Sequence, residues 1–176
     1  MRITGLNATA HRIPLDRPMV SAKYRITHRE LVAVRVETDT GLRGTGWCMV
    51  NMGALAIQAL IRSYLAPMLQ GESPLDVERH WDRLWESCHF LGPGGVSTYA
   101  IGAIDIALWD IRAQAAGMPL WRLLGGARDT VPVYASAINL HLSEAQLMEQ
   151  TETYLSQGYS AFKMKLGRPD PEEDIA

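Results

Sequence analysis

The hydrophobic positions in the first third of the chain follow the two-residue period of β-strands. Residues 3–13 carry scattered apolar side chains and predict a strand. Residues 31–38 alternate valines with other residues, which predicts a strand with one buried face. A short turn at residues 39–41 leads to a partner strand over 42–47, and the simplest arrangement of these segments is an antiparallel meander.

The segment between the first two predicted strands lacks this alternation. It contains Pro14, Pro18 and a polar run that continues to Arg29. We expect a loop of more than a dozen residues, and structureless loops of that length often serve as binding loops or lids.

The period then changes to that of helices. Residues 54–69 predict one helix, and Ser73 followed by Pro74 predicts the cap and first position of the next. The apolar stripe of that second helix is expected to comprise Val77, Trp81, Leu84, Trp85 and Cys88.

The strongest helical pattern follows a glycine-rich break at residues 92–95. Ser97 or Thr98 is the expected cap, and Gly117 ends the helix. Its buried stripe is expected to comprise Ile101, Ile104, Leu108, Ile111 and Ala115. Its other side carries Asp105, Trp109, Asp110 and Arg112, whose charges we expect to pair on the surface.

The last fifty residues change character again. Residues 131–135 form a β-run without a hairpin partner, Ser143 and Gln146 predict a capping box, and residues 159–166 predict another strand. A second helix start is predicted at residues 170–173. This order is typical of parallel β/α units.

We therefore expect two domains, residues 1–126 and 127–176, with the boundary near 125–130. On the last predicted strand, Lys163 and Lys165 share one face because side chains alternate. Two neighbouring cations indicate either a solvated surface or a site that needs positive charge, and these residues alone leave both open.

The composition excludes several classes of partner. The chain has 176 residues, a formal net charge of -2 and 47% hydrophobic residues, so we expect neither nucleic acid nor an anionic membrane as partner. Cys48 and Cys88 are too few for a disulfide framework, no signal peptide is visible, and no run approaches the ~18 apolar residues of a membrane span. We expect a cytoplasmic protein.

The histidines and the glycine-rich break do not indicate a metal or phosphate site. His80 and His89 lie near Cys88 without a compact ligand spacing, so we expect no zinc site there, and we expect His11, His28 and His141 on surfaces or loops. The glycine-rich break lacks the G-K-S/T of a phosphate loop and is expected to be a connector.

Three features in the right order resemble one family. These are the helix segment 103–110 continuing to Pro119 and the Leu-Leu-Gly-Gly run at 123–126, the meander followed by helices, and Lys163-x-Lys165 closing the second parallel strand. The chain resembles the mandelate racemase and muconate-lactonizing branch of the enolase superfamily. That resemblance implies an α+β capping domain followed by the first β/α units of a (β/α)8 barrel, incomplete in this chain.

The resemblance also implies a reaction. Family members abstract the proton α to a carboxylate and stabilise the enediolate on a divalent metal, usually Mg²⁺. It implies that Lys165 is the base, that Lys163 modulates it, and that Ser136 binds the substrate carboxylate. A free lysine is almost wholly protonated at neutral pH, and a neighbouring positive charge disfavours that protonated form.

Substrate choice in this family lies in two capping-domain loops, here about residues 15–29 and 47–53. By resemblance, Met19, Lys23 and Asn51 face the substrate. The first loop is rich in cations, which favours an acidic polyhydroxylated substrate, an acid sugar such as an aldarate or aldonate. Its cations are Arg17, Lys23, Arg25 and Arg29.

The length departs from the family pattern. A complete barrel takes about 250 residues, so we expect a longer parent whose metal ligands and second acid/base lie beyond Ala176, and no metal site or activity in the isolated chain. The leading hypothesis is the N-terminal part of an acid-sugar dehydratase, expected to form homo-oligomers. The alternatives are a racemase, epimerase or cycloisomerase of the same superfamily, or a non-catalytic capping or assembly fragment.

Overall fold

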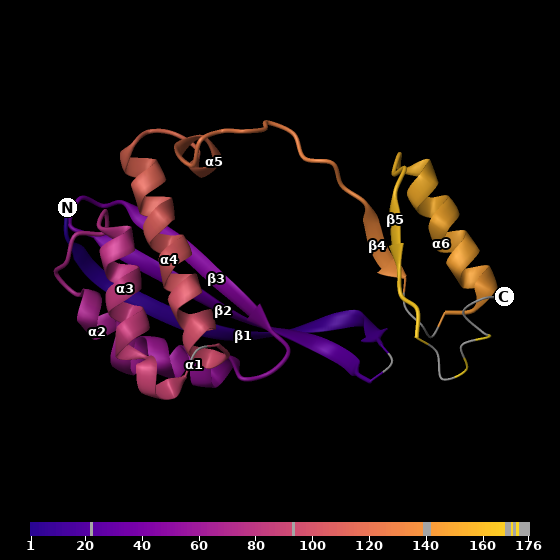
Figure 1. Ribbon diagram of the computed structural model, residues 1–176, viewed down its shortest axis with the longest axis horizontal. Coiled ribbons are helices and arrows are strands. Elements are labelled where there is room, and N and C mark those ends of the chain that lie inside the picture. The colour runs from indigo at the N-terminus through magenta and orange to yellow at the C-terminus, as the bar shows by residue number, and fades with distance from the viewer. Residues whose placement is uncertain (22, 93, 139–141, 168–169, 171, 173–176) are drawn as a thin grey trace. The chain divides into compact units, whose positions relative to one another are not determined.

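The computed structural model describes all residues except 22, 93, 139–141, 168–169, 171 and 173–176. The described chain divides into two compact units (Figure 1). The first unit comprises Met1–Ile13 with Arg29–Ala127, and the second comprises Pro14–His28 with Arg128–Ala176.

A three-stranded sheet in the order β1-β2-β3 forms one layer of the first unit, although the ends of β1 and β2 within Pro14–His28 belong to the second. Its strands are β1 (Ile3–Val20), β2 (Arg25–Thr38) and β3 (Arg43–Val50), and β2 pairs with β3 in antiparallel fashion. The predicted inward face of β2 is confirmed, because Val32, Val34 and Val36 are all buried. The meander predicted from the alternating pattern is therefore present.

The prediction of a long loop between the first two strands is wrong. β1 continues to Val20 and β2 resumes at Arg25, so most of residues 14–29 belongs to a strand pair. Pro14 and Pro18 lie four residues apart and therefore direct their nitrogens to the same side of β1. Since β1 is an outer strand of the sheet, one of its two sides needs no donors, and edge strands tolerate proline for this reason.

The predicted helix over residues 54–69 is confirmed, although its middle is wound differently. It consists of α1 (Ala54–Leu60), a π-helical turn η1 (Ile61–Leu65) and α2 (Ala66–Leu69). Pro67 lacks the N–H that an α-helix would direct to residue 63, and its ring crowds that carbonyl. Widening to a π turn just before the proline relieves this conflict.

The next helix starts later than the predicted cap. The helix α3 (Val77–Ser87) begins after Asp76, while the Ser73 hydroxyl accepts a hydrogen bond from the Leu75 N–H at 3.3 Å in a preceding turn. The short helix η2 (His89–Leu91) follows.

The predicted apolar stripe of α3 is partly wrong. Val77, Leu84 and Cys88 are buried as expected, but Trp81 and Trp85 are 36% and 45% exposed and stack on each other at 6.2 Å. Their place in the core is taken by His80, which is 1% exposed. The His80 ring can enter because its Nε2 lies 2.7 Å from the carbonyl oxygen of Ser73, which satisfies that nitrogen.

The longest helix, α4 (Val96–Ala115), has Gly95 at its N-cap, so the predicted caps are wrong. The Thr98 hydroxyl instead accepts from the Gly94 N–H, and the Ser97 hydroxyl donates to the carbonyl of Gly92. The predicted buried stripe is confirmed for its first four members, Ile101, Ile104, Leu108 and Ile111, whereas Ala115 is exposed. The one-turn helix α5 (Leu120–Leu123) follows.

Helix α4 lies directly on β3, and two glycines make this possible. A Cβ atom at Gly46 would lie 2.0 Å from the carbonyl oxygen of Ala103, and one at Gly44 would lie 2.0 Å from that of Ala107. Only glycine permits such close packing of helix backbone on strand backbone. The position of α4, and with it most of the core of the first unit, therefore depends on these two residues.

Among the residues that the structure describes, the polar side of α4 does not form the surface ion pairs that we expected. The Asp110 carboxylate accepts a hydrogen bond from the Thr45 N–H at 2.9 Å, and Gln114 donates to the Arg43 carbonyl at 2.7 Å. Both bonds satisfy backbone groups of β3. The Arg112 guanidinium lies 5.0 Å from the centre of the Trp109 ring, a cation–π contact within one helix.

The second unit contains β4 (Ala135–Ile138), α6 (Glu144–Ser156) and β5 (Phe162–Met164), with β4 and β5 parallel. The strand predicted at 131–135 is displaced, since residues 131–134 belong to no strand and β4 begins at Ala135. The predicted helix start at 170–173 and His141 lie partly or wholly outside the described residues. No helix in the described part of the chain is both long and apolar enough to cross a membrane.

Candidate active site

Ser136 and Lys163, far apart in the sequence, are direct partners in the β4–β5 pair. The register aligns Ala135 with Phe162, Ser136 with Lys163, and Ile138 with Met164, with an irregularity after Ser136. Partners directly opposite each other in a sheet present their side chains on the same face. The structure therefore brings the predicted carboxylate-binding hydroxyl next to the first lysine of the pair.

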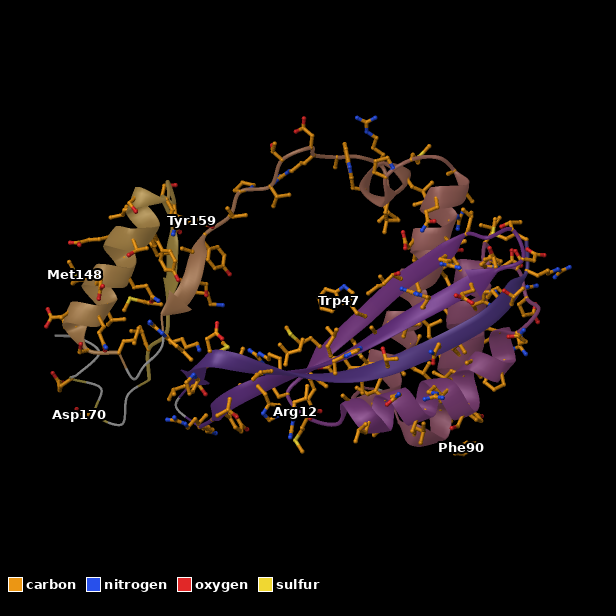
Figure 2. All side chains as sticks on the ribbon, turned by 180° about the vertical axis from the view of Figure 1, so that it is seen from behind. Arg12, Trp47, Phe90, Met148, Tyr159 and Asp170 are labelled. Atoms are coloured by element: carbon orange, nitrogen blue, oxygen red, sulfur yellow. The ribbon has the colours of Figure 1, made fainter. Side chains whose placement is uncertain are left out.

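The other side of β5 packs against α6, and this fixes which way Lys163 points. The ring of Phe162 stacks on that of Tyr154 in α6 at 6.5 Å, and Tyr159, labelled in Figure 2, meets Tyr154 edge-on at 5.9 Å. Because successive strand side chains alternate faces, Lys163 points away from the helix. Lys165 follows two residues later, just beyond the strand, and is partly buried.

The helix that orients this strand has the predicted capping box. The Ser143 hydroxyl accepts from the Gln146 N–H, and the Gln146 side chain accepts from the Ser143 N–H at 2.9 Å. This exchange fixes the start of α6 after the segment that leaves β4. Gly158, with φ of 88°, lets the chain turn back toward β5, as its predicted terminating role requires.

Met19 and Lys23 lie at the end of the β1–β2 hairpin. Met19 is a partly buried residue of β1, and Lys23 is exposed in the connecting turn. The turn is closed by two hydrogen bonds, from the Ser21 N–H to the Tyr24 carbonyl at 2.9 Å and from the Tyr24 N–H to the Ser21 hydroxyl at 3.2 Å. The lysine is thus carried on a defined turn.

Asn51 lies in the first unit, immediately after β3, with an exposed side chain. Its amide oxygen accepts a hydrogen bond from the Arg29 guanidinium. The neighbouring Glu30 accepts from the Ala54 N–H at 3.0 Å and forms an ion pair with Arg12 at 3.5 Å. Our sequence reasoning listed Arg29 only as one of several loop cations and missed Glu30 altogether.

A cavity of about 430 Å³ lies in the first unit beside α3 and α4. Burial raises the pKa of the Asp105 carboxyl, one of its lining groups. Burial likewise raises the pKa of the Cys48 thiol, which keeps this cysteine in its unreactive protonated form. The lining residues are Val77, Glu78, Trp81, Asp82, Asp105 and Trp109.

Within the described residues, no three His, Cys, Asp or Glu side chains lie close enough together to hold a metal ion. The described part of the chain therefore does not fit a magnesium centre.

Comparison with known proteins shows the family to which this chain belongs. A family model described as mandelate racemase / muconate lactonizing enzyme, N-terminal domain, matches residues 3–125. The chain belongs to the mandelate racemase/muconate lactonizing enzyme family of the enolase superfamily. It comprises this family's N-terminal capping domain, with an antiparallel meander plus helices, followed by the start of an incomplete barrel.

Relatives within this family are named after different enzyme activities. The chain is 40% identical over 175 residues to a 3,6-anhydro-alpha-L-galactonate cycloisomerase of Streptomyces coelicolor, covering 98% of this chain and 48% of that protein. It is 37% identical over 142 residues to a D-mannonate dehydratase of Novosphingobium aromaticivorans, covering 80% and 35% respectively.

Solved structures of the family agree with the fold. The L-talarate/galactarate dehydratase of Salmonella typhimurium, liganded with Mg and L-lyxarohydroxamate, superposes with a TM-score of 0.93 at 30% identity, covering 99% of this chain and 46% of that one. The chain thus spans about half the length, or less, of the mandelate racemase/muconate lactonizing enzyme relatives that it matches.

Proposed function

We propose that the full-length protein is an acid-sugar dehydratase that abstracts the proton α to the carboxylate of an aldarate or aldonate. The observation that carries this proposal is the pairing of Ser136 with Lys163 on adjacent parallel strands, with Lys165 just beyond the second strand. Family membership and relatives named as acid-sugar dehydratases support it.

The proposed roles follow from the chemistry of each side chain. Lys165 removes the α-proton, and the positive charge of Lys163 attracts the carboxylate of the substrate. The Ser136 hydroxyl donates a hydrogen bond to a carboxylate oxygen beside Lys163. We propose that Met19, Lys23 and Asn51 contact the remainder of the substrate.

We further propose that Mg²⁺ binds residues beyond Ala176, as structures of relatives with bound Mg support. The domain division at 126/127, assembly into homo-oligomers and a cytoplasmic location are proposals of the same kind. The burial of Cys48 and Cys88 as free thiols supports a reducing compartment.

Replacing the proposed base tests the mechanism. In the full-length protein, Lys165→Met should lower kcat for acid-sugar dehydration by at least about a hundredfold, the usual contribution of a general base. It should also abolish exchange of the substrate α-proton with deuterated solvent. The control Arg128→Met changes an exposed cation of the same unit and should leave both rates unchanged.

Two results would contradict the proposal. Turnover by Lys165→Met at the parent rate would remove the lysine from the chemistry. Failure of the full-length protein to release water from any member of a broad acid-sugar panel in the presence of Mg²⁺ would reject the dehydratase assignment itself.

A second candidate, cycloisomerase, racemase or epimerase, has one observation in its favour. The Streptomyces coelicolor relative that matches 98% of this chain is named a cycloisomerase. The same proton abstraction begins both kinds of reaction, so the lysine pair does not separate them. Product mass does, because dehydration removes one water from the substrate and isomerisation leaves the mass unchanged.

A further inference from the structure

Arg29 and Asn51 stand opposite each other just where the β2–β3 ladder ends. The last pair of that ladder is Glu30 with Val50, so the next pair in the same register is Arg29 with Asn51. The guanidinium of Arg29 donates to the Asn51 side-chain oxygen. The contact is therefore built into the register of the sheet.

Glu30, the next residue of β2, fixes the other end of the same segment. Its side chain is only 16% exposed, and its carboxylate accepts from the Ala54 N–H at 3.0 Å while pairing with Arg12. The N-cap of α1, Gly53, has no side chain to cap the helix and has φ of 95°. Glu30 supplies the missing anionic cap from across the sheet. Consecutive residues of β2 thus hold segment 51–54 at both ends.

The contact with Arg29 also determines which atoms of Asn51 remain available. A guanidinium has donors and no acceptor, so only the amide oxygen of Asn51 can face it. The NH₂ group of this exposed side chain is then left as the group that can bind something else. Held in this way, Asn51 keeps both N–H donors for a ligand, while its oxygen already accepts from Arg29.

We propose that Arg29 is a positioning residue that holds Asn51 with its NH₂ group directed at a carboxylate or hydroxyl oxygen of the acid-sugar substrate. This rests on the proposed function, which places Asn51 at the substrate. It deepens that proposal, because it assigns Asn51 to an acceptor oxygen and makes Arg29 a determinant of substrate affinity without contact with the reacting atoms.

A double-mutant cycle in the full-length enzyme tests the proposal. Arg29→Met should raise KM for the acid sugar about tenfold with kcat almost unchanged, the loss expected for one bond to a charged group. In the Asn51→Ala background the same change should have no further effect on KM. Arg29→Lys, which keeps a donor-only cation, should recover part of the affinity. Arg35→Met on the same strand, whose partner is Thr45, is the matched control and should leave KM unchanged.

A conservative change of Asn51 gives the sharpest outcome. Asn51→Asp keeps the pairing with Arg29 and removes the NH₂ donors, so its KM should rise as much as that of Asn51→Ala. Parent-like KM in Asn51→Asp, or independent effects of the Arg29 and Asn51 substitutions, would overturn the proposal. A fall in kcat without a change in KM for Arg29→Met would overturn it as well.

Failure of the proposed function is recognised separately. If the parent enzyme turns over no acid sugar, the proposed function fails. The unfolding midpoints in urea are then compared for the parent, Arg29→Met, Asn51→Ala and the double variant. Coupled effects of the two substitutions on the midpoint confirm the positioning contact, and additive effects overturn it.

Discussion

The close approach of α4 to β3 makes a specific prediction about Gly46. In Gly46→Ala, the new methyl carbon would lie 2.0 Å from the carbonyl oxygen of Ala103 and 2.7 Å from the nitrogen of Ala107. Both neighbours are helix backbone, which has no rotamer to change. The helix must therefore move away from the strand by about 1.5 Å, the shortfall from an ordinary van der Waals contact of about 3.5 Å.

That displacement affects much of the core. Helix α4 contributes a continuous set of buried residues, and the bonds from Thr45 to Asp110 and from Gln114 to Arg43 tie the same helix to the same strand. We expect a loss of about 3 kcal/mol, the upper part of the range for overpacking in a close-packed core. This is roughly a third of the stability of an ordinary domain.

Urea unfolding followed by tryptophan fluorescence measures the effect. The five tryptophans of the chain all fall within residues 47–121, so their emission reports on the first unit. Gly102→Ala is the matched control, because Gly102 lies within α4 with nothing near a Cβ there. It should raise stability by about 0.5–1 kcal/mol through better helix propensity. A midpoint for Gly46→Ala equal to or above that of the parent would refute the packing argument.

Two further predictions concern pH and helix capping. Burial raises the folded-state pKa of Asp105 above its ordinary value of 3.8, so its contribution to stability is full below that pH and is lost as the pH rises through the raised value. Asp105→Asn should therefore gain stability relative to the parent as the pH rises from about 3 to about 7, and a pH-independent difference in thermal midpoint would contradict this. Ser143→Ala should cost about 1 kcal/mol at the start of α6, seen as faster amide exchange in its first turn. Ser156→Ala, at the far end of α6, should leave that turn unchanged, and equal effects of the two variants would speak against the capping box.

Elements specified by neighbouring residues were predicted correctly from the sequence. The capping box of Ser143 and Gln146 uses groups three residues apart, and the valines of β2 alternate within one strand. The meander of β2 and β3 follows from a short turn between two alternating runs. In each case the deciding contacts are local, so the order of residue types contains the information. The lysine pair and the family helix segment were found in the same way.

Tertiary structure decided the features that depend on what lies next to a segment. Prolines and charges at residues 14–29 predicted a loop, and the position of β1 at the edge of the sheet made them compatible with strands. His80 rather than Trp81 or Trp85 entered the core, and the Ser73 carbonyl from a preceding turn satisfies the Nε2 of its ring. Burial of a polar ring depends on such a partner, which helical spacing does not reveal.

In the candidate site, too, some features follow from the sequence and others from the tertiary structure. The sequence by itself predicted a strand that carries Lys163 and Lys165, of which the structure places only Lys163 within β5, and an earlier β-run followed by Ser136. Only the tertiary structure aligned Ser136 with Lys163 and set Arg29 against Asn51, because register between separate strands is fixed by the packing of whole faces and not by any one residue.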